Sequence, residues 1–211
     1  RGLVQDNTTS ASNFGESINR YHGVDATASF RLPSGTFLNT GFNMQQRLLD
    51  DCAANRVDSP EAQFCRQLTP FRPDFKISAS HTLPLAIQVS GLFQLSPGPG
   101  ITATWNPPNS ATAPALGRNL AAGATSTKAI ELIEPGTVYG ENHTQLDLRM
   151  SRRFSVGRFR VRGDAALYNV FNNDWVSSVN TTFSTAASNA FMRPTGVLQG
   201  RLFKIGLQLE Y

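Results

Sequence analysis

Hydrophobic and polar residues alternate along several stretches of this chain, most clearly at its C-terminal end. In the segment that starts at Val197, one face ends in a run of apolar residues, namely Phe203, Ile205, Leu207, Leu209 and Tyr211. The opposite face carries polar and small residues, namely Lys204, Gly206, Gln208 and Glu210. A period of two is typical of a β-strand, and a tilted strand of roughly nine to eleven residues can span a bilayer. We therefore predict a strand with one face suited to lipid and the other to water.

The same alternation predicts three hairpins upstream. Their strands are residues 24–31 with 38–45, 75–82 with 87–94, and 142–154 with 158–171. Short turns at residues 33–35, 83–85 and 155–157 separate the two strands of each hairpin. With the C-terminal segment these make about seven strands, and consecutive hairpins favour an all-β antiparallel meander.

The connections between the predicted strands differ in length in a regular way. Short turns alternate with long loops at about residues 50–71, 96–141 and 172–196. Bacterial outer-membrane barrels have this asymmetry, with short periplasmic turns and long extracellular loops. We therefore expect residues 1–18 to end an extracellular loop and residues 19–211 to form the C-terminal strands of a larger transmembrane β-barrel. Because single-chain bacterial barrels have an even number of strands and no open edges, we also expect further N-terminal strands.

Composition and charge agree with strands that have one polar face. The chain has 211 residues, of which 40% are hydrophobic and only 16% charged. The formal net charge is +4, but the basic residues are spread along the chain, whereas nucleic-acid binding favours a clustered basic patch. We therefore expect no nucleic-acid partner. The sequence contains no run of 18 consecutive apolar residues, so it predicts no transmembrane helix. Strands that cross a membrane need no such run.

Candidate chemistry is sparse. Cys52 and Cys65 flank a polar stretch that is typical of a surface loop. They form either one disulfide in an oxidising compartment or two free thiols in a reducing one, and the loop context favours the disulfide. His22, His81 and His143 fall on different predicted strands. We expect no catalytic residues, no metal site and no cofactor, so the chain is not predicted to be an enzyme.

The polar faces of the predicted strands carry several charges. In a barrel these side chains would line the lumen, and the set comprises Asp147, Arg149, Arg160, Arg162, Asp164, Lys204 and Glu210. Opposite charges on neighbouring strands can pair across a sheet. We therefore expect Asp147 or Arg149 to pair with Arg162 or Asp164.

Longer segments resemble a known family. The stretch VYGENHTQLDLRMSRRFSVGRFRVRGDAALYNVFNND at 138–174, followed by RPTGVLQGRLFKIGLQLEY at 193–211, resembles the closing strands of TonB-dependent receptor-like barrels. YHGVDATASFRLPSGTFLNTGF at 21–42 resembles an upstream strand and turn of the same proteins. The nearest group is the Oar-like set, whose members carry an N-terminal carboxypeptidase-regulatory-like domain. The resemblance runs from about Asn19 to Tyr211, and LYNVFN at 167–172 is among its most specific parts.

The resemblance implies an energised receptor of the bacterial outer membrane, with roughly twenty-two strands and an internal plug. Its implied partners are the TonB system, the plug and N-terminal strands of the parent chain, and outer-membrane lipid. It also implies that the barrel-assembly machinery reads the last strand, here Phe203, Ile205, Leu207, Leu209 and Tyr211. The resemblance does not indicate which ligand is taken up.

Two functions from different classes remain open at this point. One is a membrane-embedded receptor or transporter, and the other is a soluble all-β binding module such as a lectin-like sandwich. In a barrel the apolar strand faces meet lipid, whereas in a sandwich they pack against each other. The charges on the polar faces and the sorting of loops by length favour the barrel.

Overall fold

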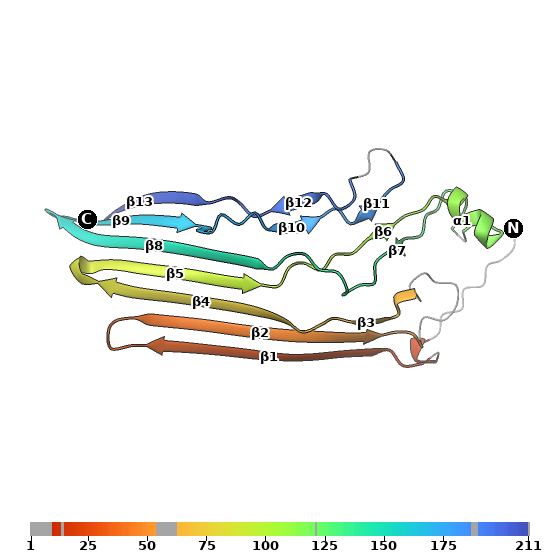
Figure 1. Cartoon of the computed structure of the whole chain (residues 1–211), viewed down its shortest axis with the longest axis horizontal. Helices are drawn as coiled ribbons and strands as arrows, with labels where there is room; N and C mark the ends of the chain where they lie inside the picture. Colours follow the sequence, from red (N-terminus) through yellow and green to blue (C-terminus); the bar gives the residue numbers. More distant parts are fainter. Residues whose placement is uncertain (1–9, 14, 54–62, 121, 187–189, 211) are drawn as a thin grey trace.

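The long strands form one antiparallel sheet in the order of the chain. The computed structural model describes residues 10–13, 15–53, 63–120, 122–186 and 190–210. Within these ranges, seven strands follow one another across the sheet (Figure 1), and the short strand β3 (Arg66–Leu68) adds to β2. The seven are β1 (Ile18–Arg31), β2 (Phe37–Asp50), β4 (Arg72–Leu83), β5 (Ile87–Ser96), β8 (His143–Val156), β9 (Phe159–Tyr168) and β13 (Leu202–Glu210). The predicted all-β antiparallel meander of about seven strands is confirmed.

The tight connections lie together at one end of the sheet, which we call the short-turn end (Figure 1). Residues 32–36 join β1 to β2, and Gly35 adopts a φ of 80° there. A 3-10 turn, Pro84–Ala86, joins β4 to β5, and Gly157 with a φ of 60° begins the turn between β8 and β9. Glycine reaches this left-handed region without a steric penalty, which suits it to the tight reversals at 35 and 157. The C-terminal end of β13 also points to this end.

The long connections carry regular structure at the opposite end. A three-stranded sheet joins β6 (Thr104–Trp105) to β7 (Ile130–Glu131) and to β11 (Thr182–Phe183), and β6 and β11 run parallel. A second small sheet pairs β10 (Val176–Val179) with β12 (Pro194–Val197), and the helix α1 spans Asn109–Leu116. The first of these sheets therefore unites two long connections that are far apart in the sequence (Figure 1).

The C-terminal strand is shorter than the alternation of residues predicts. Alternation begins at Val197, but β13 begins at Leu202. Side chains from the end of β9 hold the intervening backbone, because Asn169 Nδ2 donates to the carbonyl of Gln199 (3.0 Å) and Asn172 Oδ1 accepts from the amide of Arg201 (2.9 Å). These side-chain hydrogen bonds replace the ladder that a continuous strand would make.

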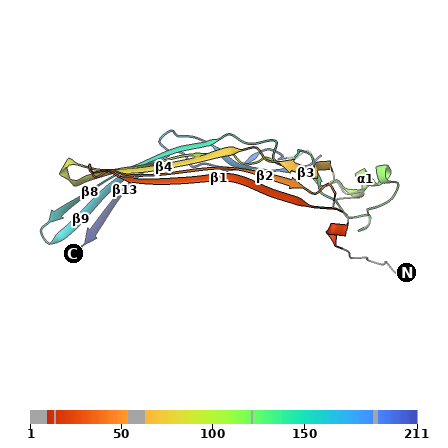
Figure 2. The ribbon, with the colours of Figure 1, turned by 90° about the horizontal axis from the view of Figure 1, so that it is seen from below.

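The main sheet is a single layer, and no second sheet is stacked on it within the described residues (Figure 2). The chain exposes 14969 Å² of surface. A compact monomer of its mass, 23.0 kDa, would expose roughly 9,600 Å² by the usual scaling with mass. In the described part of the chain, Ala103 and Ala166 are the buried hydrophobic residues. Both faces of the sheet are therefore left open.

Candidate functional site

The pairing register sorts the side chains of the seven long strands into two faces. Directly paired residues share a face, so the register extends each face from β1 to β13. The apolar face comprises Val24, Phe30, Leu38, Phe42, Phe75, Ile77, Val89, Phe93, Leu148, Met150, Val161, Leu167, Phe203, Ile205, Leu207 and Leu209. The polar face includes Thr27, Asn39, Asn43, Lys76, Ser78, Ser80, Gln88, Ser90, Gln94, Asp147, Arg149, Arg160, Arg162, Asp164, Lys204 and Gln208.

Large side chains on the apolar face are open to the surroundings. Ile205, Leu207 and Leu209 are 71%, 76% and 69% exposed, which is unusual for side chains of this size and type. The apolar stretch runs from Val24 to Phe30 on β1 and from Ile87 to Leu95 on β5. At the usual rise per residue these stretches are about 20 and 27 Å long, close to the ~25 Å apolar band of outer-membrane barrels. Contiguous apolar patches of this extent mark surfaces that contact another protein, a membrane or a ligand.

Two long polar side chains, those of His81 and Arg152, interrupt the apolar face near the short-turn end. His81 pairs with Val89, and its Nδ1 lies 2.8 Å from Oγ1 of Thr36. Arg152 pairs with Ile87 on one side and Gly163 on the other. Both positions are within a few residues of a tight turn, where a long polar side chain can reach water.

The seven charged residues predicted to line a lumen share one face by register. Six of them have described side chains, and Glu210 is placed by its backbone opposite Arg160. Nη2 of Arg149 lies 2.8 Å from Oδ1 of Asp164, and Nε of Arg162 lies 3.5 Å from the same oxygen. The structure thus pairs Arg149 with Asp164, one of the combinations expected from the sequence.

Asp147 has a different role from the expected ion pair. Its carboxylate accepts hydrogen bonds from Nε2 of Gln145 (2.9 and 3.0 Å) and from the backbone amide of Asn169 (2.8 Å). The amide belongs to the turn that follows β9, so Asp147 ties β8 to that turn.

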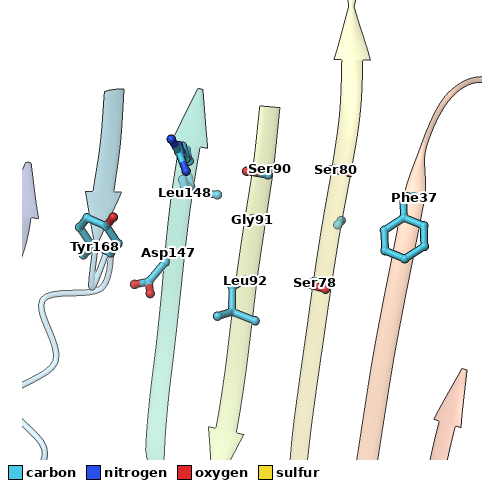
Figure 3. A pocket seen from close by; sticks show the side chains of 11 residues that line it. Phe37, Ser78, Ser80, Ser90, Gly91, Leu92, Asp147, Leu148 and Tyr168 are labelled. Atoms are coloured by element: carbon cyan, nitrogen blue, oxygen red, sulfur yellow. The ribbon is translucent and has the colours of Figure 1, made fainter. Parts of the chain in front are cut away.

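A shallow hollow lies on the polar face across β2, β4, β5, β8 and β9 (Figure 3). Its volume is about 350 Å³, and its lining includes Phe37, Ser78, Leu92, Asp147 and Tyr168. Two aromatic rings and a leucine therefore stand on the same face as serine hydroxyls and a carboxylate. The lining of this hollow is thus chemically mixed.

A network of asparagines at the end of β9 was missed by sequence reasoning, which singled out LYNVFN only through resemblance. Asn169 is 2% exposed and adopts a φ of 49°. Its Nδ2 donates to the carbonyls of Asn173 (2.8 Å) and Gln199 (3.0 Å), and its Oδ1 accepts from the amide of Asn173 (2.9 Å). Asparagine tolerates this backbone region and bonds the nearby main chain, which is the signal that could have identified it.

Side chains also join the main sheet to the long connections. The guanidinium of Arg72 stacks 3.9 Å from the ring centre of Tyr139, and its Nη1 donates to the carbonyl of Gly98 (2.6 Å). Trp175 stacks on His143 with ring centres 4.6 Å apart and donates to the carbonyl of Glu141 (2.7 Å). These contacts hold the long connections against the ends of β4 and β8.

A disulfide joins Cys52 to Cys65, as the loop context predicted. Their Cα atoms are 4.7 Å apart, and the amide of Asp51 donates to the carbonyl of Cys65 (2.8 Å). The bond closes the connection between β2 and β3. Of the predicted C-terminal assembly signal, Phe203, Ile205, Leu207 and Leu209 lie on the apolar face, and Tyr211 lies outside the described residues.

In the described ranges, no helix is long and apolar enough to cross a membrane, and no three His, Cys, Asp or Glu side chains gather as metal ligands. Comparisons with protein-family models, with curated proteins and with solved structures find no match to this chain. The resemblance to TonB-dependent receptor-like barrels therefore stays a prediction that rests on the sequence segments quoted above.

Proposed function

We propose that this chain forms part of the wall of a bacterial outer-membrane β-barrel that serves as a TonB-dependent uptake receptor. The observation that carries the proposal is the two-faced single sheet. Its apolar face is exposed and continuous over seven strands, and its polar face carries charges. In a membrane the apolar face would meet lipid and the polar face would meet an aqueous lumen.

The separation of short and long connections gives an orientation to this proposal. The short-turn end would face the periplasm, and the disulfide and the small sheets of the long connections would face outside. An oxidising exterior suits the Cys52–Cys65 disulfide. The extracellular part would then be a folded cap that links several connections, because β6 and β11 pair across it.

The topology adds a condition on how such a barrel closes. Each of the seven strands is antiparallel to the next, so β1 and β13 run in the same direction. Direct pairing of β1 with β13 would be parallel. An all-antiparallel barrel therefore needs an odd number of further strands between these two edges, and both outermost added strands must run opposite to β1 and β13. A second copy of this sheet in the same orientation does not meet this condition, because its edge strands run in the same direction as β1 and β13.

The soluble alternative, a lectin-like sandwich, needs a second sheet on the apolar face. The long strands all belong to one sheet in the described part of the chain, which weighs against this alternative. The uptake ligand stays open, because no described site selects one.

The first test of the proposal is membrane fractionation combined with heat-modifiable gel mobility of the detergent-extracted protein. A barrel fractionates with the outer membrane and changes its mobility on boiling. Release into the soluble fraction without detergent, with no change on boiling, would overturn the proposal.

A second test distinguishes the two faces directly. Single cysteines at Val89 and Ser90 place a fluorescent label on opposite faces of β5, which is an interior strand. Brominated lipids should quench the label at 89 and leave the label at 90 unchanged. Equal quenching at both positions would contradict the assignment of the faces.

Transport needs its own test. Depletion of solutes from the medium is compared among wild-type cells, cells that lack this protein and cells that lack the TonB system. The proposal expects the same solute to remain in both mutant cultures. If uptake by this protein continues without the TonB system, the proposed TonB-dependent function is contradicted, whereas the proposal of a barrel is unaffected.

A further inference from the structure

The tip of the β8–β9 hairpin concentrates positive charge. Residues 151–163 read SRRFSVGRFRVRG and contain five arginines and no acidic residue. By register Arg153 lies directly opposite Arg162, and Arg160 lies opposite Ser155, all on the polar face. Like charges that are directly opposed across two strands destabilise the pairing. We therefore expect a negatively charged group to lie near this pair and to offset the repulsion.

Neighbouring groups neutralise this cluster only in part. Asp164 lies nearer to Arg149, at 2.8 Å, than to Arg162, at 3.5 Å. Among the described side chains, Arg153 and Arg160 have no hydrogen-bond or ion-pair partner. The flanking strand β5 contributes uncharged Gln88 and Ser90 to this face.

The other flanking strand, β13, adds charges of both signs. It contributes Lys204 opposite Ala166, Gln208 opposite Arg162, and Glu210 opposite Arg160 by its backbone position. On the polar face of β8, β9 and β13, basic residues therefore outnumber acidic ones, with Arg149, Arg153, Arg160, Arg162 and Lys204 against Asp147, Asp164 and Glu210.

A hollow of about 260 Å³ lies among these arginines. It is lined by Arg153, Phe154, Ser155, Arg160, Val161 and Arg162. The planar fork of a guanidinium matches the oxygens of phosphate in a two-point contact, and a serine hydroxyl can donate a further hydrogen bond. The hollow is smaller than the 300–1,000 Å³ or so that is usual for drug-sized ligands, so it suits a small anion.

We propose that Arg153, Arg160, Arg162 and Ser155 form a binding site for a phosphate-class anion at the short-turn end of the polar face. The anion relieves the repulsion between Arg153 and Arg162 and bridges β8 to β9. This inference goes beyond the barrel proposal and does not depend on it, because the site is built within one hairpin. The phosphate can come from a free small molecule or from a phospholipid headgroup.

The test uses the protein as its source cells make it, extracted in detergent, and inorganic pyrophosphate as the probe. Isothermal titration calorimetry is performed on the wild type and on the double variant Arg153→Gln with Arg162→Gln. The matched control is Arg152→Gln with Arg158→Gln, which removes the same charge from the same hairpin outside the hollow. We expect the first pair to weaken binding at least about tenfold, because it removes two guanidinium groups that would make charge-assisted hydrogen bonds to the phosphate. The control should change affinity less than about threefold, a difference of roughly 0.7 kcal/mol.

A charge-conserving variant keeps the test decisive where glutamine affects folding. Arg153→Lys with Arg162→Lys retains both charges and loses the guanidinium forks, so it should also weaken binding. Equal losses in the hollow and control variants would overturn the site, as would a wild-type protein that binds no pyrophosphate and no anionic lipid.

The source of the phosphate is distinguished with nanodiscs of phosphatidylglycerol or phosphatidylcholine. Lipid binding that needs the anionic headgroup, is displaced by pyrophosphate and is lost in the hollow variant identifies a phospholipid. Pyrophosphate binding without any preference for anionic lipid identifies a free phosphate compound. Heat-modifiable gel mobility is measured separately from anion binding. A protein that binds the anion but shows no mobility change on boiling would contradict the barrel proposal and leave the anion site standing.

Discussion

Nη2 of Arg149 lies 2.8 Å from Oδ1 of Asp164, and this contact links β8 to β9 diagonally across the polar face. The side chains are 49% and 23% exposed, so water screens the pair. Exposed ion pairs of this kind contribute little to stability, typically less than about 1 kcal/mol. The pair is therefore better understood as orienting two side chains on the polar face than as holding the sheet together.

A double-mutant cycle with Arg149→Met and Asp164→Asn should therefore give a small coupling energy. We expect about 0.5–1 kcal/mol, measured by urea unfolding of the detergent-refolded protein. The value should fall when salt is raised from low to molar concentration, because the charges are exposed. A coupling above about 3 kcal/mol would show that the pair is buried in the native protein.

Asn169→Ala should lower the free energy of unfolding by more than the small change in side-chain volume suggests. The change removes two donated hydrogen bonds and one accepted bond at a side chain that is 2% exposed. It also places alanine at a φ of 49°, which alanine tolerates less well than asparagine. We expect a loss of about 2–4 kcal/mol in the free energy of unfolding, since buried backbone groups lose their partners.

The matched control for Asn169 is Asn180→Ala. Asn180 makes a local hydrogen bond to the amide of Thr182 at 3.0 Å, in an exposed connection. This variant should lose less than about 1 kcal/mol. Similar losses of unfolding free energy in both variants would show that the asparagine network at the end of β9 does not contribute more to stability than an exposed asparagine does.

Arginine substitutions on adjacent residues of β4 should separate the two faces. Ile77 lies on the apolar face between Thr40 and Phe93, and Ser78 lies on the polar face between Asn39 and Leu92. In a barrel, Ile77→Arg should destabilise the protein by about 2–4 kcal/mol, as arginine does on the lipid face near the bilayer midplane. Ser78→Arg should cost less than about 1 kcal/mol, and both are measured by unfolding from lipid vesicles. Equal costs would contradict the face assignment.

Loss of the Cys52–Cys65 disulfide should lower stability without changing which face meets lipid. The two cysteines are 13 residues apart, and closing a loop of about this length is worth roughly 3 kcal/mol in the chain-entropy model. Thermal unfolding with and without reductant measures the difference. The double variant Cys52→Ser with Cys65→Ser is the control, and it should show no further effect of reductant. A wild-type protein that is insensitive to reductant would contradict the expectation.

Much of this architecture could be predicted from local patterns. Alternation in segments such as 203–209 determines a two-faced strand, because successive side chains of an extended backbone point to opposite sides. Turn residues such as Gly35 and Gly157 mark the reversals for the same local reason. The disulfide also followed from a short separation within one predicted loop.

The tertiary structure alone decided what depends on distant segments meeting. Asp147 looked like a partner for an arginine, but the turn after β9 brings the amide of Asn169 to its carboxylate. The strand predicted from Val197 begins five residues later, because Asn169 and Asn172 hold the intervening backbone. The opposition of Arg153 and Arg162 likewise depends on pairing register, and a shift of one residue would send one of them to the other face. Alternation thus determined that each strand has two faces, whereas long-range pairing decided which side chains meet on them.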